Sequence, residues 1–204
     1  TRPVDGAIFA VVSRKENPDN DNDYLYQYRL SGAEGTVTGT LVRKFGEIAP
    51  GSEIEAIAVD NALGYIYYSD EGFGIRKYYA DPDMPNEQLA VFGQEKFAED
   101  REGISIYHTG EGTGYLVVSD QQANEFHLYP REGAEGNAHA HPLLAEVAVS
   151  TNESDGSEVT HLALTPEYPQ GLFVAMSDNK TFQLYSWADV LPDSLATGTP
   201  LAEK

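Results

Sequence analysis

Acidic and amide side chains stand at both ends of a strand–turn–strand segment in the middle of this sequence. The segment DREGISIYHTGEGTGYLVVSDQ, residues 100–121, opens with Asp100 and Glu102 and closes with Gln121. In an antiparallel hairpin, residues equidistant from the turn lie opposite each other. A turn centred in TGEGTG therefore predicts Glu102 opposite Gln121, with carboxylate and amide oxygens at the mouth of the hairpin.

Two other segments place acids in the same way. In EIEAIAVDNALGYIYYSDE, a turn centred in NALG predicts Glu55 opposite Asp70, with Glu71 one step farther. In SDGSEVTHLALTPEYPQGLFVAMSD, Asp155 lies just outside the mouth, near the level of the closing SDNK. Carboxylate and amide oxygens are hard ligands that suit Ca²⁺, which takes six to eight oxygens in flexible geometry, better than they suit zinc.

The elements that carry these acids form a repeat. Each copy has a glycine, a run of aromatic and branched residues, and a serine followed by polar residues: GAIFAVVSRK, GYIYYSDE, GYLVVSDQ and GLFVAMSDNK. The serines, at positions 13, 69, 119 and 177, are 56, 50 and 58 residues apart. A repeat of about 40–50 residues or slightly more, built of short strands, is typical of propeller blades. In the first copy the outgoing end is basic, with Arg14 and Lys15.

The rest of the chain predicts an all-β fold. Further strands are expected at Tyr24–Leu30, Gly74–Tyr79, Glu125–Tyr129 and Thr181–Trp187, and short helices only around Glu95–Glu99 and near Asp189–Leu195. We expect residues 1–204 to form a single propeller domain of about four blades. The repeat alone leaves open whether this is a small closed propeller or a portion of a larger one.

Propeller blades radiate from one axis, so equivalent hairpin mouths meet on one rim. Six side chains should therefore converge there as ligands of calcium ions: Glu55, Glu71, Asp100, Glu102, Gln121 and Asp155. Without cations these carboxylates would repel one another and remain partly protonated. The alternative is that the acids are ordinary solvated strand ends, because loops are polar and exposed.

The net charge of the chain limits the kinds of molecule that it is expected to bind. The chain has 13 basic and 33 acidic residues, a net charge of −20 and a pI near 4.4. Nucleic acid and anionic membranes would be repelled, so neither is expected as a direct partner. The charge fits either an acidic coat or carboxylates that hold cations. The sequence has no cysteine, which excludes thiolate metal sites and a cysteine nucleophile. No apolar run is long enough to span a bilayer.

The same segments resemble successive blades of the β-propeller phytases, the calcium-dependent alkaline phytases of bacteria, from about Gly6 to Val190. The resemblance implies a six-bladed propeller that hydrolyses phytate, myo-inositol hexakisphosphate, with calcium ions that bridge enzyme and substrate and activate a water. It implies catalytic roles for Glu55, Glu71, Glu102 and Asp155, calcium ligation by these four with Asp100 and Gln121, and phosphate binding by Lys15 with Arg14 beside it. It also implies a secreted or periplasmic protein whose partners are inositol phosphates in complex with calcium.

The chain departs from the family pattern in several places. The resemblance begins partway round the propeller, so the early blades and their basic substrate contacts are missing, and the isolated chain could be inactive. Ala56 replaces the family glycine after the first glutamate, and only Asn152 and Glu153 stand where an additional Asp-Gly pair is common. Asn179 is a weak candidate ligand in a shortened loop.

Other functions remain open. The chain could be a non-catalytic partial propeller that binds calcium or inositol phosphates, or that assembles with a partner domain. A metal-dependent lactonase-like propeller is permitted by the carboxylates but not suggested by the order of the motifs. An open set of blades exposes sheet edges, so we expect self-association or a missing partner segment. The histidines are interpreted as surface or turn residues, with His139 and His141 a weak transition-metal alternative; the others are His108, His127 and His161.

Overall fold

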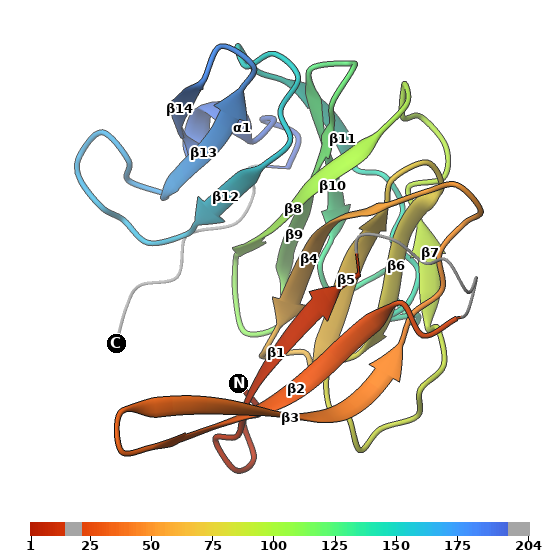
Figure 1. Ribbon diagram of the computed structural model, residues 1–204. Helices are drawn as coiled ribbons and strands as arrows, with labels where there is room; N and C mark the ends of the chain where they lie inside the picture. The colour runs from red at the N-terminus through yellow and green to blue at the C-terminus, as the bar shows by residue number, and fades with distance from the viewer. Residues whose placement is uncertain (15–21, 196–204) are drawn as a thin grey trace.

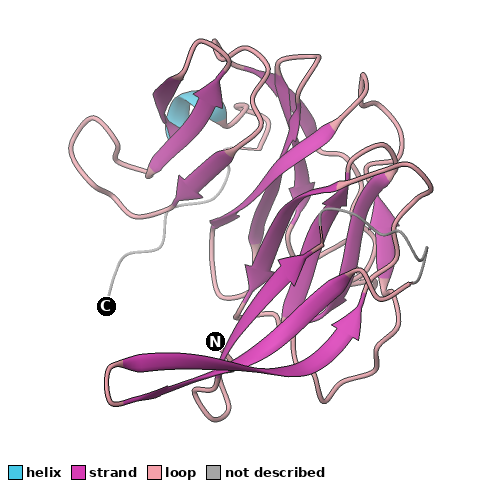
Figure 2. Ribbon diagram, viewed as in Figure 1, coloured by secondary structure: helices cyan, strands magenta, loops and turns pink. Residues whose placement is uncertain are grey.

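The protein is almost entirely β-structure (Figure 2). The computed structural model describes residues 1–14 and 22–195. The described strands form four antiparallel sheets, followed by one short helix. In chain order the elements are β1 (Ile8–Ser13), β2 (Leu25–Ala33) and β3 (Thr36–Phe45); β4 (Ile54–Asp60), β5 (Tyr65–Asp70), β6 (Gly74–Tyr79) and β7 (Ala90–Phe92); β8 (Arg101–His108), β9 (Gly114–Asp120), β10 (Glu125–Pro130) and β11 (Ala145–Ala148); β12 (Ser157–Thr160), β13 (Leu172–Ser177), β14 (Thr181–Ser186) and α1 (Trp187–Val190).

The four sheets follow one another as propeller blades do. Within each sheet, neighbouring strands are consecutive in the sequence. Figure 1 shows the sheets in an arc, with β1–β3 at one end and β12–β14 at the other. β4 contacts β8, and β8 contacts β12, so these three are the inner strands. They line a cavity of about 490 Å³. The prediction of an all-β propeller with about four blades is confirmed.

Most of the expected elements are present. Strands are found at all four places where the sequence predicts them, as β2, β6, β10 and β14. The helix expected around Glu95–Glu99 is wrong: the segment contains only bends, and Lys96 has φ of 75°, which a right-handed helix excludes. The helix near Asp189 begins two residues earlier than expected, at Trp187.

The Gly-to-Ser motif marks the second strand of a blade. It forms β5 and β9, each of which lies just outside an inner strand, and also β13. In the first sheet the motif forms β1, which is an edge strand. Among the described residues, the first sheet therefore lacks an inner strand, and the fourth sheet lacks the outermost one. The two ends of the arc are incomplete in opposite ways.

Apolar side chains fill the spaces between consecutive sheets. On β5, Ile66 and Tyr68 face the first sheet while Tyr67 faces the third, as the two-residue period of a strand requires. Between the third and fourth sheets, Trp187 is completely buried and stacks on Tyr107 with ring centroids 4.2 Å apart. Each inner blade is thus apolar on both faces, which holds the sheets in order.

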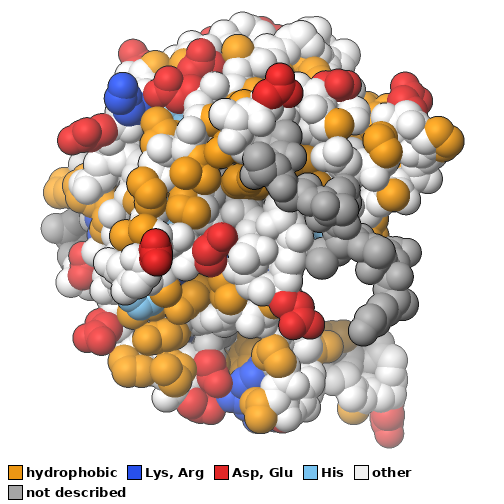
Figure 3. All heavy atoms as spheres, turned by 180° about the vertical axis from the view of Figure 1, so that it is seen from behind, with side chains coloured by type: hydrophobic (Ala, Val, Ile, Leu, Met, Phe, Trp, Pro, Cys, Tyr) orange, Lys and Arg blue, Asp and Glu red, His pale blue; other side chains and the backbone are white. Residues whose placement is uncertain are grey.

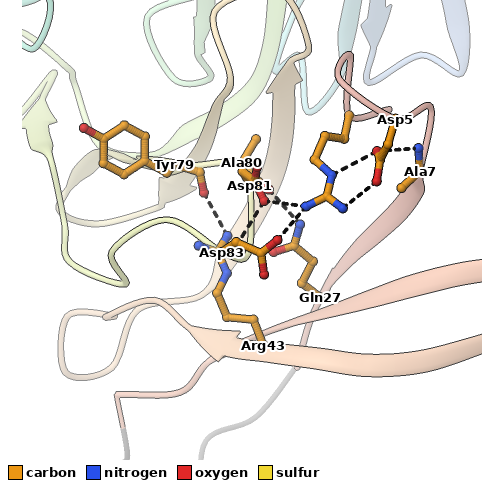
Figure 4. A network of polar contacts seen from close by, with 9 residues as sticks. Asp5, Ala7, Gln27, Arg43, Tyr79, Ala80, Asp81 and Asp83 are labelled. Carbon is orange, nitrogen blue, oxygen red and sulfur yellow. Dashed lines mark hydrogen bonds and ion pairs between the residues drawn. The ribbon is translucent and has the colours of Figure 1, made fainter.

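Polar contacts also join the first two sheets, at the segment around Tyr79–Asp83 (Figure 4). The Arg2 guanidinium lies between Asp5 at 2.7 Å, Asp83 at 2.7 Å and Asp81 at 3.0 Å. Gln27 donates to the Ala80 carbonyl at 2.8 Å, and Arg43 donates to the Tyr79 carbonyl at 2.8 Å. Arg2 thus fixes the segment that precedes β1 against the second sheet, and Gln27 and Arg43 fix β2 and β3 to it.

The surface agrees with the acidic composition. On the face shown in Figure 3, carboxylates are spread among apolar side chains, and basic side chains are few. In the part of the chain that the structure describes, no helix has the length and apolar character needed to cross a bilayer.

The two end sheets each expose an apolar face. On β14, Phe182 and Leu184 are 70% and 55% exposed, and on β1, Ile8 and Val12 are 53% and 45% exposed. Residues an even number apart on a strand share a face. Phe182 and Leu184, two apart, therefore form one patch, and Ile8 and Val12, four apart, lie on one face of β1. Exposed apolar patches of this kind favour association.

We therefore expect the 204-residue chain to self-associate, with a mass in light scattering above the 22.3 kDa of one chain. The double substitution Phe182→Ser, Leu184→Ser should shift the protein towards the monomer, because it removes the β14 patch. Leu164→Ser, at an exposed loop residue, is the matched control and should not. A wild-type protein that remains monomeric at high concentration would show the expectation to be wrong.

Candidate functional site

In the β4–β5 hairpin, Glu55 lies in a β-bulge. The β4–β5 pairing shifts register between Ile54 and Ile57, and Ile54, not Glu55, lies opposite Asp70. The prediction that Glu55 faces Asp70 is therefore wrong by one residue, because the extra residue of a bulge is invisible to counting from the turn. The Glu71 N–H donates to the Glu53 carbonyl at 3.0 Å, which places both ends of the hairpin at one mouth.

The middle hairpin repeats the bulge at the equivalent place. The β8–β9 pairing shifts between Arg101 and Ile104, so Glu102 lies in the bulge and is not opposite Gln121 as predicted. Asp100 is level with Gln121 instead, since its carbonyl accepts the Gln121 N–H at 3.3 Å. Bulges redirect side chains. Both candidate glutamates therefore come from the same local irregularity in neighbouring blades.

Asp155 joins the middle blade to the last one. Its carbonyl accepts the Gly103 N–H at 3.1 Å, and its carboxylate accepts a hydrogen bond from the Gln121 amide. A Cβ atom at Gly103 would lie 3.0 Å from the Ser157 nitrogen and 3.2 Å from the Asp155 carbonyl oxygen. The glycine after Glu102 is thus required by the close approach of the next blade.

Glu102 lies at the centre of the acidic groups. It is only 5% exposed, and burial raises its pKa to about 8, assisted by the negative charges of Glu55, Glu71, Asp155 and Asp100. Carboxylates from three blades therefore act on one buried carboxyl group. Such crowding favours either a proton or a cation at the site.

The donor chemistry fits calcium, but the groups are not yet arranged around an ion. Within residues 1–14 and 22–195, no three His, Asp or Glu side chains are close enough together to hold a metal as they stand. Glu55 and Asp155 are exposed, whereas Glu102 is buried. An all-oxygen set around a buried, partly protonated Glu102 suits a hard divalent cation.

The serines of the repeat support this site, a role that the sequence reasoning missed. The Ser69 hydroxyl accepts the Ala56 N–H at 2.7 Å, beside the Glu55 bulge. The Ser119 hydroxyl donates to the Ser154 carbonyl at 2.7 Å, beside Asp155. The recurrence of the serine was the signal, because it stands at the same level of each hairpin mouth.

Arg101 is a second residue that the motifs did not reveal. Its buried guanidinium donates to the carbonyls of Gly93 and Glu99 at 2.8 Å and of Glu71 at 3.2 Å. The Arg101 N–H donates to the same Glu71 carbonyl at 3.2 Å. Arg101 thus ties the Glu71 end of one blade to the Glu102 strand of the next, and brings a positive charge behind the carboxylates.

The acids that follow the motif serines are structural. Asp70 is fully buried and pairs with Arg76 at 2.8 Å. Asp120, equally buried, accepts the Ala98 N–H at 3.0 Å. Both carboxylates fix loops, and neither was among the predicted ligands.

The predicted basic residues can be placed only in part. Arg14 follows β1 and donates to the Asp23 carbonyl at 3.2 Å; its guanidinium also lies over the rings of Tyr24 and Tyr26, at 5.6 and 5.5 Å. Lys15 lies outside the described residues. The weak candidate Asn179 bonds to Thr181 of its own turn.

The interpretation of the histidines as surface or turn residues is wrong for two of them. His127 on β10 is completely buried and lies 4.1 Å from the Phe97 ring, between centroids. His141 is buried with one ring nitrogen 2.7 Å from the Pro130 carbonyl and the other 3.1 Å from the Lys77 ammonium. His141 thus has a partner for each ring nitrogen, whereas Nε2 of His127 lies 3.5 Å from a carboxylate oxygen of Asp120 and makes no hydrogen bond among the described residues. Both histidines are core residues.

Comparison with known proteins gives a consistent family assignment. The family model described as Phytase matches residues 4–187. The 3-phytase of Bacillus subtilis (strain 168) is 29% identical over 198 residues, which cover 91% of this chain and 50% of the relative. The chain therefore spans about half the length of this curated relative.

Two solved structures are also similar, at low identity. The β-propeller domain of Myceliophteria thermophila Cps50 (Swd1) is 12% identical, with a TM-score of 0.48 over 88% of this chain and 54% of that one. A DUF4623 family protein from Bacteroides eggerthii is 14% identical, with a TM-score of 0.43 over 83% of this chain and 41% of that one.

The raised pKa of Glu102 predicts a pH dependence of stability. Between its ordinary value of 4.5 and about 8, the folded protein keeps a proton that the unfolded chain has released, so stability falls as pH rises through this window. In calcium-free protein, Glu102→Gln should remove this loss of stability. The variant should therefore become more stable relative to wild type as the pH rises from 4.5 to 8. Urea unfolding measures the difference, with Glu167→Gln, at an exposed loop position, as control. If the free energy of unfolding depended on pH in the same way for wild type and Glu102→Gln, the raised pKa of Glu102 would be refuted.

The contact between Gly103 and Asp155 can be tested by adding a methyl group. Gly103→Ala should lower the free energy of unfolding by about 1–3 kcal/mol, because the added Cβ overpacks against the next blade. Gly156→Ala is the matched control, since nothing lies within 4 Å of the added atom. Equal melting temperatures for the two variants would mean that the blades are not in close contact here.

Proposed function

Because the chain belongs to the phytase family, we propose that it acts as a calcium-dependent phytase, or as part of one. The substrate would be myo-inositol hexakisphosphate bound as a calcium complex, and the reaction the hydrolysis of a phosphomonoester. The observation that supports this most directly is the convergence of Glu55, Glu71, Asp100 and Asp155 on the buried Glu102.

The charge of the protein supports a role for a divalent cation. A chain of net charge −20 would repel a polyphosphate unless cations intervened. Calcium bound at the carboxylates would neutralise phosphate charge and activate a water for attack on phosphorus. The protein would need no side-chain nucleophile, which agrees with a sequence that has no cysteine.

In this proposal each group has a defined task. Glu55, Glu71, Asp100, Glu102 and Asp155 provide carboxylate oxygens, and Gln121 provides an amide. Glu102 is proposed to give up its proton when the cation binds, because a nearby positive charge favours the ionised carboxyl group.

Basic residues would bind substrate on the other side of the rim. Arg14 follows Ser13, which corresponds to Ser69 at the mouth of the next blade. This correspondence supports the proposal that Arg14 meets phosphate oxygens at the same rim. Guanidinium groups bind phosphate through paired hydrogen bonds. Lys15 is proposed to assist in the same way.

Two sequence departures limit the number of cations that we propose. Ala56 stands in the bulge after Glu55, where its N–H is held by Ser69. The Asn152 amide donates to the Asp178 carboxylate at 3.0 Å, so Asn152 is engaged outside the cluster around Glu102. The proposal therefore rests on the ligands around Glu102 alone.

A second candidate is a binding module without turnover. The observation in its favour is that the first sheet, which carries Arg14, lacks an inner strand among the described residues. This sheet therefore has no strand equivalent to β4 and β8, the inner strands that carry acids in the next two blades. Such a module would bind calcium and inositol phosphates but would not hydrolyse them.

Phosphate release from calcium phytate at neutral to alkaline pH tests the proposal. We expect release by the wild-type chain, its loss on addition of EGTA, and a decrease of about 100-fold or more for Glu102→Gln. Glu167→Gln should behave like wild type. Calorimetric binding of phytate without any release would favour the binding module, and neither binding nor release in the presence of calcium would refute both candidates.

A further inference from the structure

Gln122 lies behind the candidate ligands and contacts two of them. It stands in the turn between β9 and β10, next to Gln121. Its amide nitrogen donates to a carboxylate oxygen of Asp100 at 2.6 Å and to the amide oxygen of Gln121 at 2.6 Å. Its amide oxygen accepts the Asp100 N–H at 2.9 Å.

These three bonds fix the orientation of the Gln122 amide. Both N–H groups and the oxygen are used, and a flipped amide would place its oxygen against two other oxygens. The Gln121 amide is oriented in consequence: its oxygen accepts from Gln122, so its nitrogen faces Asp155 and donates to that carboxylate. One glutamine thus sets the direction of a chain of hydrogen bonds from Asp100 to Asp155.

The turn that carries Gln122 is itself held in place. The Asp120 carboxylate accepts the Ala98 N–H at 3.0 Å from the preceding segment. The Asn124 N–H donates to the Gln121 carbonyl at 3.3 Å, and the Asn124 amide oxygen accepts the Glu153 N–H at 2.7 Å from the next blade. The backbone at Gln122 is therefore anchored to both sides.

This arrangement is confined to the middle blade. The position after Glu71 in the second blade is Gly72, which has no side chain and whose N–H donates to Ser52 at 3.1 Å. In the last blade the corresponding residue is Lys180, with φ of 65° at a tight turn. At this one position, and among the described residues, the middle blade has a side chain that links two candidate ligands, whereas Gly72 has none and Lys180 makes no such bond.

We infer that Gln122 is a positioning residue, which orients Asp100 and Gln121 for a calcium ion at the cluster around Glu102. The inference rests on the proposed calcium site but concerns a residue that would not itself touch the ion. One carboxylate oxygen of Asp100 and one of Asp155 are engaged in the chain of bonds. The second oxygen of each accepts no hydrogen bond within the described residues and is left for the cation.

Calcium affinity of the apo protein, measured by calorimetry without substrate, tests this role. Gln122→Met keeps the volume of the side chain but removes all three hydrogen bonds. It should weaken calcium binding about tenfold or more, as loss of an orienting partner does at metal sites. The melting temperature of the calcium-free protein should stay near that of wild type, and the Asp100 amide should exchange faster with solvent because its acceptor is gone.

Gln183→Met is the matched control. Gln183 on β14 also makes three side-chain hydrogen bonds, to Ser150 and Tyr185, but lies outside the cluster. It should leave calcium affinity unchanged, whereas a general loss of packing would affect both variants alike.

The outcomes separate the inference from the proposed function. If wild type binds calcium and Gln122→Met binds it equally well, the role of Gln122 is refuted while the calcium site stands. If wild type binds no calcium, the proposed function fails first. Should Gln122→Met fail to fold, Gln122→Asn carries the test: the amide remains but is one methylene too short to make all three bonds, so weaker binding is expected and wild-type affinity would overturn the inference.

Discussion

The carboxylates around Glu102 repel one another, and the protein must hold them together against that repulsion. Burial alone would expel or protonate such groups. The geometry is kept by backbone devices instead: a bulge in each of two neighbouring hairpins, serine hydroxyls on the adjoining peptide groups, and the close approach of Gly103 to Asp155. The charged site therefore depends on the apolar interfaces between blades, which supply the free energy that the acids oppose.

Arg101 reduces the electrostatic cost within the same framework. It is buried beside Asp100 and Glu102, yet its described hydrogen bonds all go to backbone carbonyls. Its charge acts on the carboxylates of Asp120, Asp100 and Asp70, of which Asp100 belongs to the cluster around Glu102.

The sequence predicted the repeat and the all-β propeller, because these depend on periodicity and residue type. It also named the acids near Glu102, whose role as ligands stays a prediction. It did not predict which residues lie opposite Glu55 and Glu102 in their hairpins, because a bulge adds one residue to a strand and leaves no sign in the sequence pattern. It also missed Arg101, Gln122 and the buried His127. Their roles come from contacts between blades or across turns, which hydrophobic periodicity does not encode. β3, β7 and β11 were also missed. β7 and β11 have only three and four residues, too few to show a two-residue period, and β3 is exposed along most of its length.

The position of Trp187 has a practical consequence. It is the only tryptophan in the chain, it is fully buried, and it stacks on Tyr107 where the third and fourth sheets meet. Its emission spectrum is therefore an intrinsic optical reporter of that junction, free of background from other indoles. A red shift on unfolding would signal the entry of water between these two sheets in particular, without any attached label.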